Sequence, residues 1–110
     1  MLISTEETIA TFTRESSSFK EFSKRFSNEY PKYQKYHIIL NLFSLDQLEV
    51  NDLLEFLEIS DNHRSEKKSF VLVTDAVVID DIPEALAVVP TLQEAYDLIE
   101  MEEIERDLDF

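Results

Sequence analysis

Two nearly continuous apolar runs, residues 37–43 and residues 69–74, stand out in the pattern of this chain. Both have the length of a strand, and neither has a polar face. Such runs are typical of strands that are covered on both faces of a sheet. The β-branched run 8–13 predicts, with the residues before it, a hairpin over residues 1–14. Val88 and Val89 predict a last, short strand, so we expect a mixed sheet of about five strands.

Segments whose apolar residues have helical spacing lie between and after these strands. Four aromatic rings recur every three or four residues and predict a helix over Phe19–Glu29 that ends before Pro31. A second apolar stripe predicts a helix over residues 50–62, and Pro83 suggests a short helix or 3₁₀ segment over residues 82–86. The closing helix has an apolar stripe that runs nearly to the end of the chain. The stripe positions are Phe19, Phe22, Phe26 and Tyr30; Val50, Leu53, Leu54 and Leu57; and Leu92, Ala95, Tyr96, Ile99, Ile104 and Leu108.

Two capping boxes mark where helices begin. Ser18 with Glu21 opens the first helix, and Thr91 with Glu94 opens the last. Pro90 ends the strand before the last helix, because it has no N–H to give to a ladder. With about four helices around about five strands, the pattern predicts an α/β fold.

Length and composition limit the organisation. A chain of 110 residues forms one core, so residues 1–110 are expected to be a single domain. There is no cysteine, which excludes disulfides, thiolate zinc sites and cysteine nucleophiles. No basic segment followed by an apolar run opens the chain, and no apolar run approaches the ~20 residues that span a bilayer. We therefore expect a cytoplasmic protein that is not inserted in a membrane.

The chain also has no glycine. Glycine-rich loops that cradle phosphates and the calcium loop of EF-hands all need glycine, so these nucleotide and calcium motifs are excluded. Backbone positions with positive φ must use another residue type. Asn28, Asn41 and Asn62 are the expected candidates, because asparagine tolerates that conformation best.

Charge is strongly negative and uneven. The net charge is −14, and eleven of these negative charges lie from Asp75 onward. Such a surface repels phosphates, so we expect no direct binding of nucleic acid or anionic lipid and favour a basic protein partner. The acidic face of the last helix, with Glu100, Glu102 and Glu103, is a candidate partner-binding site. A solvated face that only keeps the domain soluble is the simpler explanation, and both remain open.

Catalytic and metal-binding patterns are missing. His37 opens an apolar strand and is expected to be structural, whereas His63 lies in a polar stretch and is expected to be exposed. Neither has a second histidine at metal-ligand spacing, and the serines lack the motifs of activated nucleophiles. We expect no catalytic residues, no metal and no cofactor. One segment rich in basic and aromatic residues could instead bind RNA. Its helical periodicity favours a simpler explanation, in which the aromatic rings lie in the core and the basic side chains face solvent. The basic residues are Lys20, Lys24, Arg25, Lys32 and Lys35.

The order of predicted elements, with the strand-like runs 38–42 and 69–73, resembles STAS domains, which sulphate transporters and anti-sigma factor antagonists share. Residues 88–95, VVPTLQEA, resemble the family's last strand and the opening of its last helix. Residues 101–108 further resemble a stand-alone bacterial subgroup associated with a ribonuclease Z-type endonuclease. The resemblance implies a STAS-like fold and a protein-interaction or regulatory role.

The chain departs from the family at its regulatory serine. Antagonist STAS domains carry a phosphorylated serine at the start of the helix after the central strand. The matching positions here are Glu49, Val50, Asn51 and Asp52, none of which has a hydroxyl group. A phosphate switch cannot operate there, so we expect a non-switching module that uses these four residues to bind a partner.

Three functions stay open at this stage. The first is a non-enzymatic protein-interaction module, monomeric or weakly dimeric, whose partner is a basic regulator or the neighbouring nuclease. The second is an accessory protein of that RNA-processing nuclease. The third is a small-ligand-binding domain, which would need a polar pocket with a titratable group of shifted pKa.

Overall fold

A five-stranded sheet forms the centre of the computed structural model, which describes residues 1–15, 18–42, 48–76 and 81–108. The strands are β1 (Leu2–Glu6), β2 (Ile9–Thr13), β3 (His37–Asn41), β4 (Phe70–Val73) and β5 (Ala87–Val89). They lie side by side in the order β1-β2-β3-β4-β5. The first pair is antiparallel and the other three pairs are parallel, so the sheet is mixed, as the sequence predicts.

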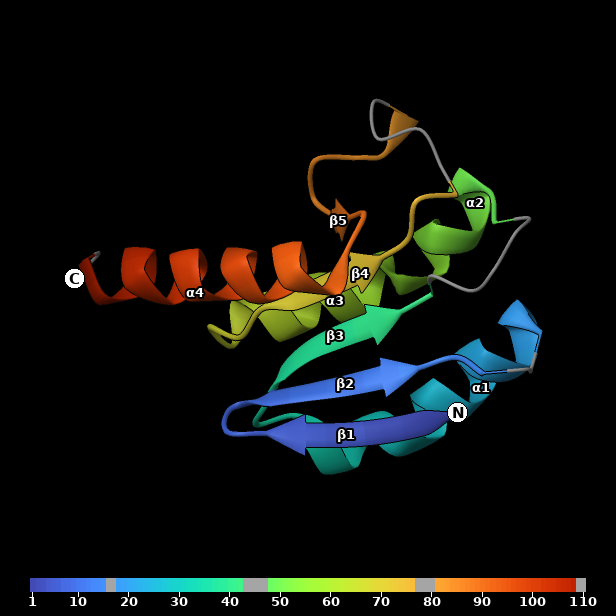
Figure 1. Ribbon diagram of the computed structural model, residues 1–110, viewed down its shortest axis with the longest axis horizontal. Coiled ribbons are helices and arrows are strands. Elements are labelled where there is room, and N and C mark those ends of the chain that lie inside the picture. The colour runs from blue at the N-terminus through green and yellow to red at the C-terminus, as the bar shows by residue number, and fades with distance from the viewer. Residues whose placement is uncertain (16–17, 43–47, 77–80, 109–110) are drawn as a thin grey trace.

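Helices pack on both faces of this sheet (Figure 1). They are α1 (Phe19–Glu29), α2 (Val50–Leu53), α3 (Leu57–Ser65) and α4 (Leu92–Leu108), with 3₁₀ turns η1 (Tyr30–Tyr33) and η2 (Leu54–Phe56). Because α2, η2 and α3 follow each other without a break, the described helices form three runs rather than about four. The α/β class is therefore confirmed with this small difference.

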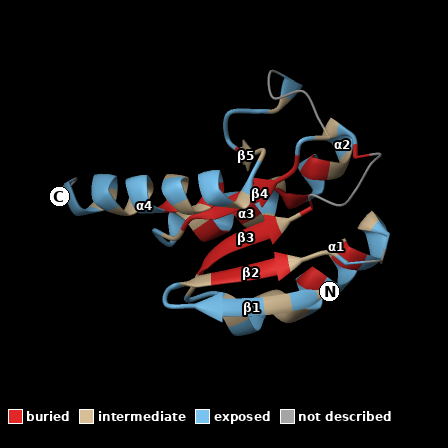
Figure 2. Cartoon of the chain, in the orientation of Figure 1, coloured by how far each residue is buried: buried red, intermediate tan, exposed pale blue. Residues whose placement is uncertain are grey.

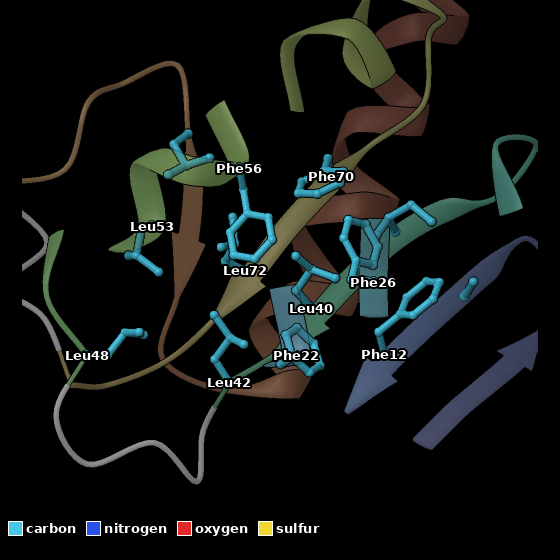
Figure 3. Close-up of a cluster of buried hydrophobic side chains, with 13 residues drawn as sticks. Phe12, Phe22, Phe26, Leu40, Leu42, Leu48, Leu53, Phe56, Phe70 and Leu72 are labelled. Carbon is cyan, nitrogen blue, oxygen red and sulfur yellow. The ribbon is translucent and has the colours of Figure 1, made fainter. Parts of the chain in front are cut away.

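Side-chain alternation in the strands separates two clusters of buried residues. Figure 3 shows the larger cluster, where Phe22 and Phe26 of α1 and Phe56 of η2 meet the strands. Ile38 and Leu40 of β3 point into this cluster, while Ile39 points to the other face, under α4. The continuous apolar runs are thus explained by a sheet that is covered on both sides, and β2 and β3 are buried red in Figure 2.

Two expectations about single elements are wrong. Residues 82–86 form no helix; the Leu86 N–H donates to the Pro83 carbonyl at 3.0 Å, which closes a turn. Among the described residues, those with positive φ are Glu7 and Lys67 rather than asparagines. Glu7 lies in the tight turn between β1 and β2, and Lys67 lies in the turn that ends α3, so the change of chain direction decides the backbone conformation at both residues. The sequence also predicts a loop over residues 44–49 and a helical turn over residues 75–81, but both lie largely outside the described residues.

Candidate functional site

The last helix, α4, has two different faces. Ala95 and Ile99 lie four residues apart and are buried against the sheet. Met101, Ile104 and Leu108 follow an i, i+3, i+7 spacing on the opposite side, with 57%, 54% and 76% of their surface exposed. We call these three residues the outer stripe. The predicted apolar stripe therefore does not continue inward along the whole helix, because Ile104 and Leu108 point to solvent.

Polar side chains replace apolar ones where the inner face of α4 passes the sheet. Glu102 accepts hydrogen bonds from the Ser69 hydroxyl at 2.6 Å and from the Arg64 guanidinium at 3.0 Å. Arg106 lies one turn further on and donates to the Ser69 oxygen at 3.1 Å. Ser69 is fully buried at the start of β4. A carboxylate between two guanidinium groups thus ties α4 to α3 and β4.

A second polar link joins α4 to the start of β3. The Ser69 N–H donates to Nδ1 of His37 at 2.9 Å, so this nitrogen carries no proton. Nε2 carries the proton and donates to the Glu103 carboxylate. Burial lowers the pKa of His37 below its usual 6.5, and the nearby Glu103 carboxylate only partly opposes this. His37 is therefore a neutral, structural residue, in agreement with the sequence.

These contacts determine which carboxylates of α4 are available to a partner. Glu102 and Glu103 are both bonded to the protein itself, and Glu102 is neutralised by the two arginines. Glu100 is exposed, as are Asp97, Glu105 and Asp107. Of the three acidic candidates, only Glu100 therefore points freely to solvent. Met101, which is not part of the apolar stripe predicted for this helix, completes the outer stripe.

An acidic hollow lies beside the outer stripe. It has a volume of about 230 Å³ and lies between α4 and the β1–β2 turn. Glu7, Glu100 and Glu103 contribute carboxylates, while Tyr96 and Ile99 supply apolar walls. None of its lining residues is a cation. Such a hollow suits the aliphatic stem and charged end of a lysine or arginine side chain.

The second histidine contradicts the expectation of exposure. His63 lies in α3 and is 1% exposed. Its Nε2 donates to the Tyr36 carbonyl at 2.7 Å, so Nδ1 accepts from the Tyr30 hydroxyl, also at 2.7 Å. Burial lowers the pKa of His63 and raises that of Tyr30. The polar residues around His63 suggested a loop, but they belong to the exposed side of a helix whose other side is buried.

Tyr30 and His63 also line a hollow of about 460 Å³ at the end of α3. Two ammonium groups, two carboxamides and one carboxylate complete the polar part of its wall, and Ile59 gives an apolar part. These polar residues are Gln34, Lys35, Asn62, Glu66 and Lys68. The combination of polar groups with shifted pKa values fits a small polar ligand better than an apolar one.

The other predicted site, residues 49–52, lies at the start of α2. Glu49 and Asn51 are exposed, and Val50 and Asp52 are half-buried. The Glu49 N–H donates to Oδ2 of Asp52 at 3.0 Å, so the helix caps its own first turn. The structure brings these four residues together, but it separates them from the acidic face of α4, which lies on the other side of the sheet (Figure 1).

The described residues contain no group of three or more histidine, aspartate or glutamate side chains that could hold a metal ion. None of the described helices is long and apolar enough to cross a membrane. The buried Ser69 hydroxyl donates to a carboxylate, and both ring nitrogens of each histidine are in hydrogen bonds. These polar groups position secondary structure elements.

Comparison with known proteins gives no identity. No family model matches this chain, and no curated protein matches it. The fold and the geometry of its surfaces are therefore the basis for any functional assignment.

Proposed function

We propose that this protein is a non-enzymatic protein-interaction module with a STAS-like fold, and that it binds its partner through the outer face of α4. The order of elements that suggested the resemblance is present along the chain, except for the short helix, and supports the STAS-like part. The candidate partners are a basic regulator, which the negative charge of the chain favours, or the ribonuclease Z-type nuclease that the resemblance implies.

The outer stripe is the observation that carries this proposal. Its three large apolar side chains gather on one side of a helix whose other side already has partners. A helix face that remains in water normally consists of polar residues, because contact between large apolar side chains and water is unfavourable. A contiguous apolar patch with a polar rim is typical of an interaction site, whereas scattered single residues are not.

A capture experiment with matched variants tests the proposal. Tagged wild-type protein and the triple variant M101S/I104S/L108S are incubated with lysate of the source organism, and bound proteins are quantified by mass spectrometry. Leu2→Ser is the control, because Leu2 is equally exposed, at 56%, but lies on β1. We expect a stoichiometric partner with the wild type and L2S that is lost with the triple variant. Equal capture by all three proteins would disprove the proposed surface.

The proposal includes the absence of a serine switch at the start of α2. Residues 48–53 contain no hydroxyl group, and the Asp52 carboxylate already accepts from the N–H of Glu49, the residue that caps the helix. Ser60 lies close in sequence but is fully buried. Incubation with kinases from the source organism should therefore give no stoichiometric phosphoserine between residues 48 and 60, as located by tandem mass spectrometry of peptides.

Small-ligand binding is the second candidate function, favoured by the hollow at Tyr30 and His63. A ligand there would change the proton chemical shifts of the His63 ring, which donates and accepts hydrogen bonds at the wall of the hollow. Screening of small polar metabolites by NMR tests this function. Saturable shifts at His63 that Lys68→Glu abolishes would support it, and a screen without such shifts would reject it.

A further inference from the structure

We infer that the partner of the outer stripe is a basic amphipathic helix, with an apolar row that packs on Met101, Ile104 and Leu108 and with lysine or arginine on both flanks of that row. This inference rests on the proposed function of α4 and names the chemistry of its partner. The arrangement of charged residues around the outer stripe supports this inference.

Carboxylates lie on both flanks of the outer stripe. Glu100 is four residues before Ile104 on one flank, and Glu105 is four residues after Met101 on the other. Asp97 continues the row of the stripe toward the helix start, and all three are exposed. The only cation of α4 is Arg106, which points inward to Ser69 and Glu102. Any helix that covers the stripe therefore meets negative charge on each side.

The helix itself adds to this negative potential. Carbonyl groups at a helix C-terminus carry partial negative charge, and the stripe lies in the last turns of α4. Glu105 and Asp107 are near that end. A cationic partner would relieve this repulsion, so its binding should also stabilise the protein against heat.

The acidic hollow gives one flank a defined contact. Glu100 of α4 lines it, and a second carboxylate comes from a separate part of the chain, Glu7 in the β1–β2 turn. Tyr96 can pack against the stem of a long basic side chain or bind its cation over the ring. A lysine or arginine of the partner helix that lies beside Ile104 would reach this hollow.

A second copy of the chain is a poor occupant by the same reasoning. Two α4 helices packed stripe to stripe would bring their flanking carboxylates together without any compensating cation. Like charges across an interface oppose association at low and moderate ionic strength. The stripe is also short: Leu108 lies seven residues after Met101, which corresponds to roughly 10 Å of helix.

A peptide of defined chemistry tests the inference. The probe is a fluorescent 18-residue peptide of leucine and lysine whose leucines recur with helical spacing, and its control is a scrambled peptide of the same composition. We expect the wild-type protein to bind the amphipathic peptide at least tenfold more tightly than the scrambled one, as measured by fluorescence anisotropy. The triple variant M101S/I104S/L108S should bind both peptides equally weakly, with its helical content unchanged by circular dichroism.

Single charge variants test the flanks. Glu100→Gln should weaken binding of the amphipathic peptide severalfold and reduce its salt dependence, and Glu105→Gln should act in the same direction on the other flank. Glu58→Gln is the control, because Glu58 is an exposed carboxylate on α3. An effect of E58Q as large as that of E100Q would show that only net charge matters and would overturn the inference.

The two proposals can fail separately. Equal binding of amphipathic and scrambled peptides would overturn the basic helix as partner, while a stripe-dependent partner in the capture experiment would still support the interaction module. Capture that is independent of the stripe would reject the interaction module, and the inference would fall with it. Stripe-dependent dimers at moderate salt, seen by sedimentation velocity, would identify a second copy as the occupant instead.

Discussion

Glu102 connects three elements through one carboxylate. Its oxygens bind Arg64 of α3, Ser69 at the start of β4, and the Arg106 side chain of the same helix. With 19% of its side chain exposed, it is mostly shielded from water. Two guanidinium groups face its negative charge. Removing the carboxylate charge would leave both arginines without their ionic partner and lower the free energy of unfolding.

We predict that Glu102→Gln lowers the free energy of unfolding by about 2 kcal/mol, because charge-assisted hydrogen bonds to Arg64 and Ser69 are weakened. Glu105→Gln on the exposed side should change it by less than about 0.5 kcal/mol. Urea unfolding followed by circular dichroism measures both. A similar effect of the two substitutions would show that Glu102 has no special role in holding α4.

Stability should also depend on pH through the two histidines. Burial lowers the pKa of His37 and His63 in the folded state below the usual 6.5. Below about pH 6.5 the unfolded chain then binds more protons than the folded chain, so stability falls as the pH drops. The loss levels off once the pH is below the folded-state pKa values. Above about pH 6.5 these histidines make no change in stability with pH.

The urea midpoint at about pH 7.5 and about pH 5.5 tests this prediction. The midpoint should fall toward the lower pH in the wild type, and the fall should be smaller in His63→Gln. Glutamine can still donate to the Tyr36 carbonyl and accept from the Tyr30 hydroxyl, but it does not titrate. An equal fall in both proteins would mean that His63 is not the group responsible.

The roles of single residues could be predicted only where the local pattern decides them. The cap at Ser18 was predictable, and its oxygen accepts from the Glu21 N–H at 3.2 Å. The burial of His63 was not, because it depends on Tyr30 and Tyr36, which are far away in sequence. The inward contacts of Glu102 likewise depend on Arg64 and Ser69, which local spacing cannot reveal.

At the scale of elements, α4 has one part that packs on the sheet and another part whose apolar side chains are exposed to solvent. Ile99 is 1% exposed against β3 and β4, whereas Ile104 is 54% exposed. Both are isoleucines of the same helix, so they have the same helix propensity. Substituting each of them therefore compares the contribution to stability of a position that packs on the sheet with that of a position that is exposed.

We predict that Ile99→Ala costs about 3 kcal/mol of unfolding free energy, because it removes buried methyl groups and leaves a cavity. Ile104→Ala should change the free energy by less than about 0.5 kcal/mol and should be neutral or slightly stabilising. Thermal and urea unfolding of both variants checks this difference. Equal destabilisation would mean that Ile104 packs against the protein in solution, and the outer stripe would then not be free.

Element boundaries followed the sequence best where caps and prolines agree with periodicity. The first helix covers Phe19–Glu29 as predicted, since Ser18 caps it and a 3₁₀ turn with Pro31 follows. The helix predicted over residues 50–62 is divided into α2, η2 and α3 and extends to Ser65. Apolar spacing cannot reveal such a change of helix type, because both forms can bury Leu53 and Phe56.

For the whole molecule, repulsion between identical acidic surfaces should keep the protein monomeric. We predict a monomer at low salt and a weak dimer at about 1 M NaCl, where a Debye length of roughly 3 Å removes the repulsion and apolar burial remains. Analytical ultracentrifugation at neutral pH tests this, with M101S/I104S/L108S as control. A dimer that persists in the triple variant would place the contact elsewhere.

The mixed sheet and α/β class were predictable because apolar runs of strand length indicate strands that are covered on both faces. The surface that carries the proposed function was only half predictable. Its acidic character is a property of composition, but the exposure of Met101, Ile104 and Leu108 follows from where α4 leaves the sheet. Sequence spacing predicts that such residues share a face; it does not tell whether that face has a partner.

The consecutive strand order leaves β1 and β5 at the two edges of the sheet. Unpaired edges can template the addition of further strands, which is a route to fibrils. β5 has only three residues and is followed by Pro90, while β1 ends at Glu6 beside the left-handed Glu7. A short edge, a proline and a charged turn are common protections against such growth. The outer stripe lies on a helix, whose backbone groups are already bonded within the helix, so these exposed apolar side chains offer no backbone on which a fibril could grow.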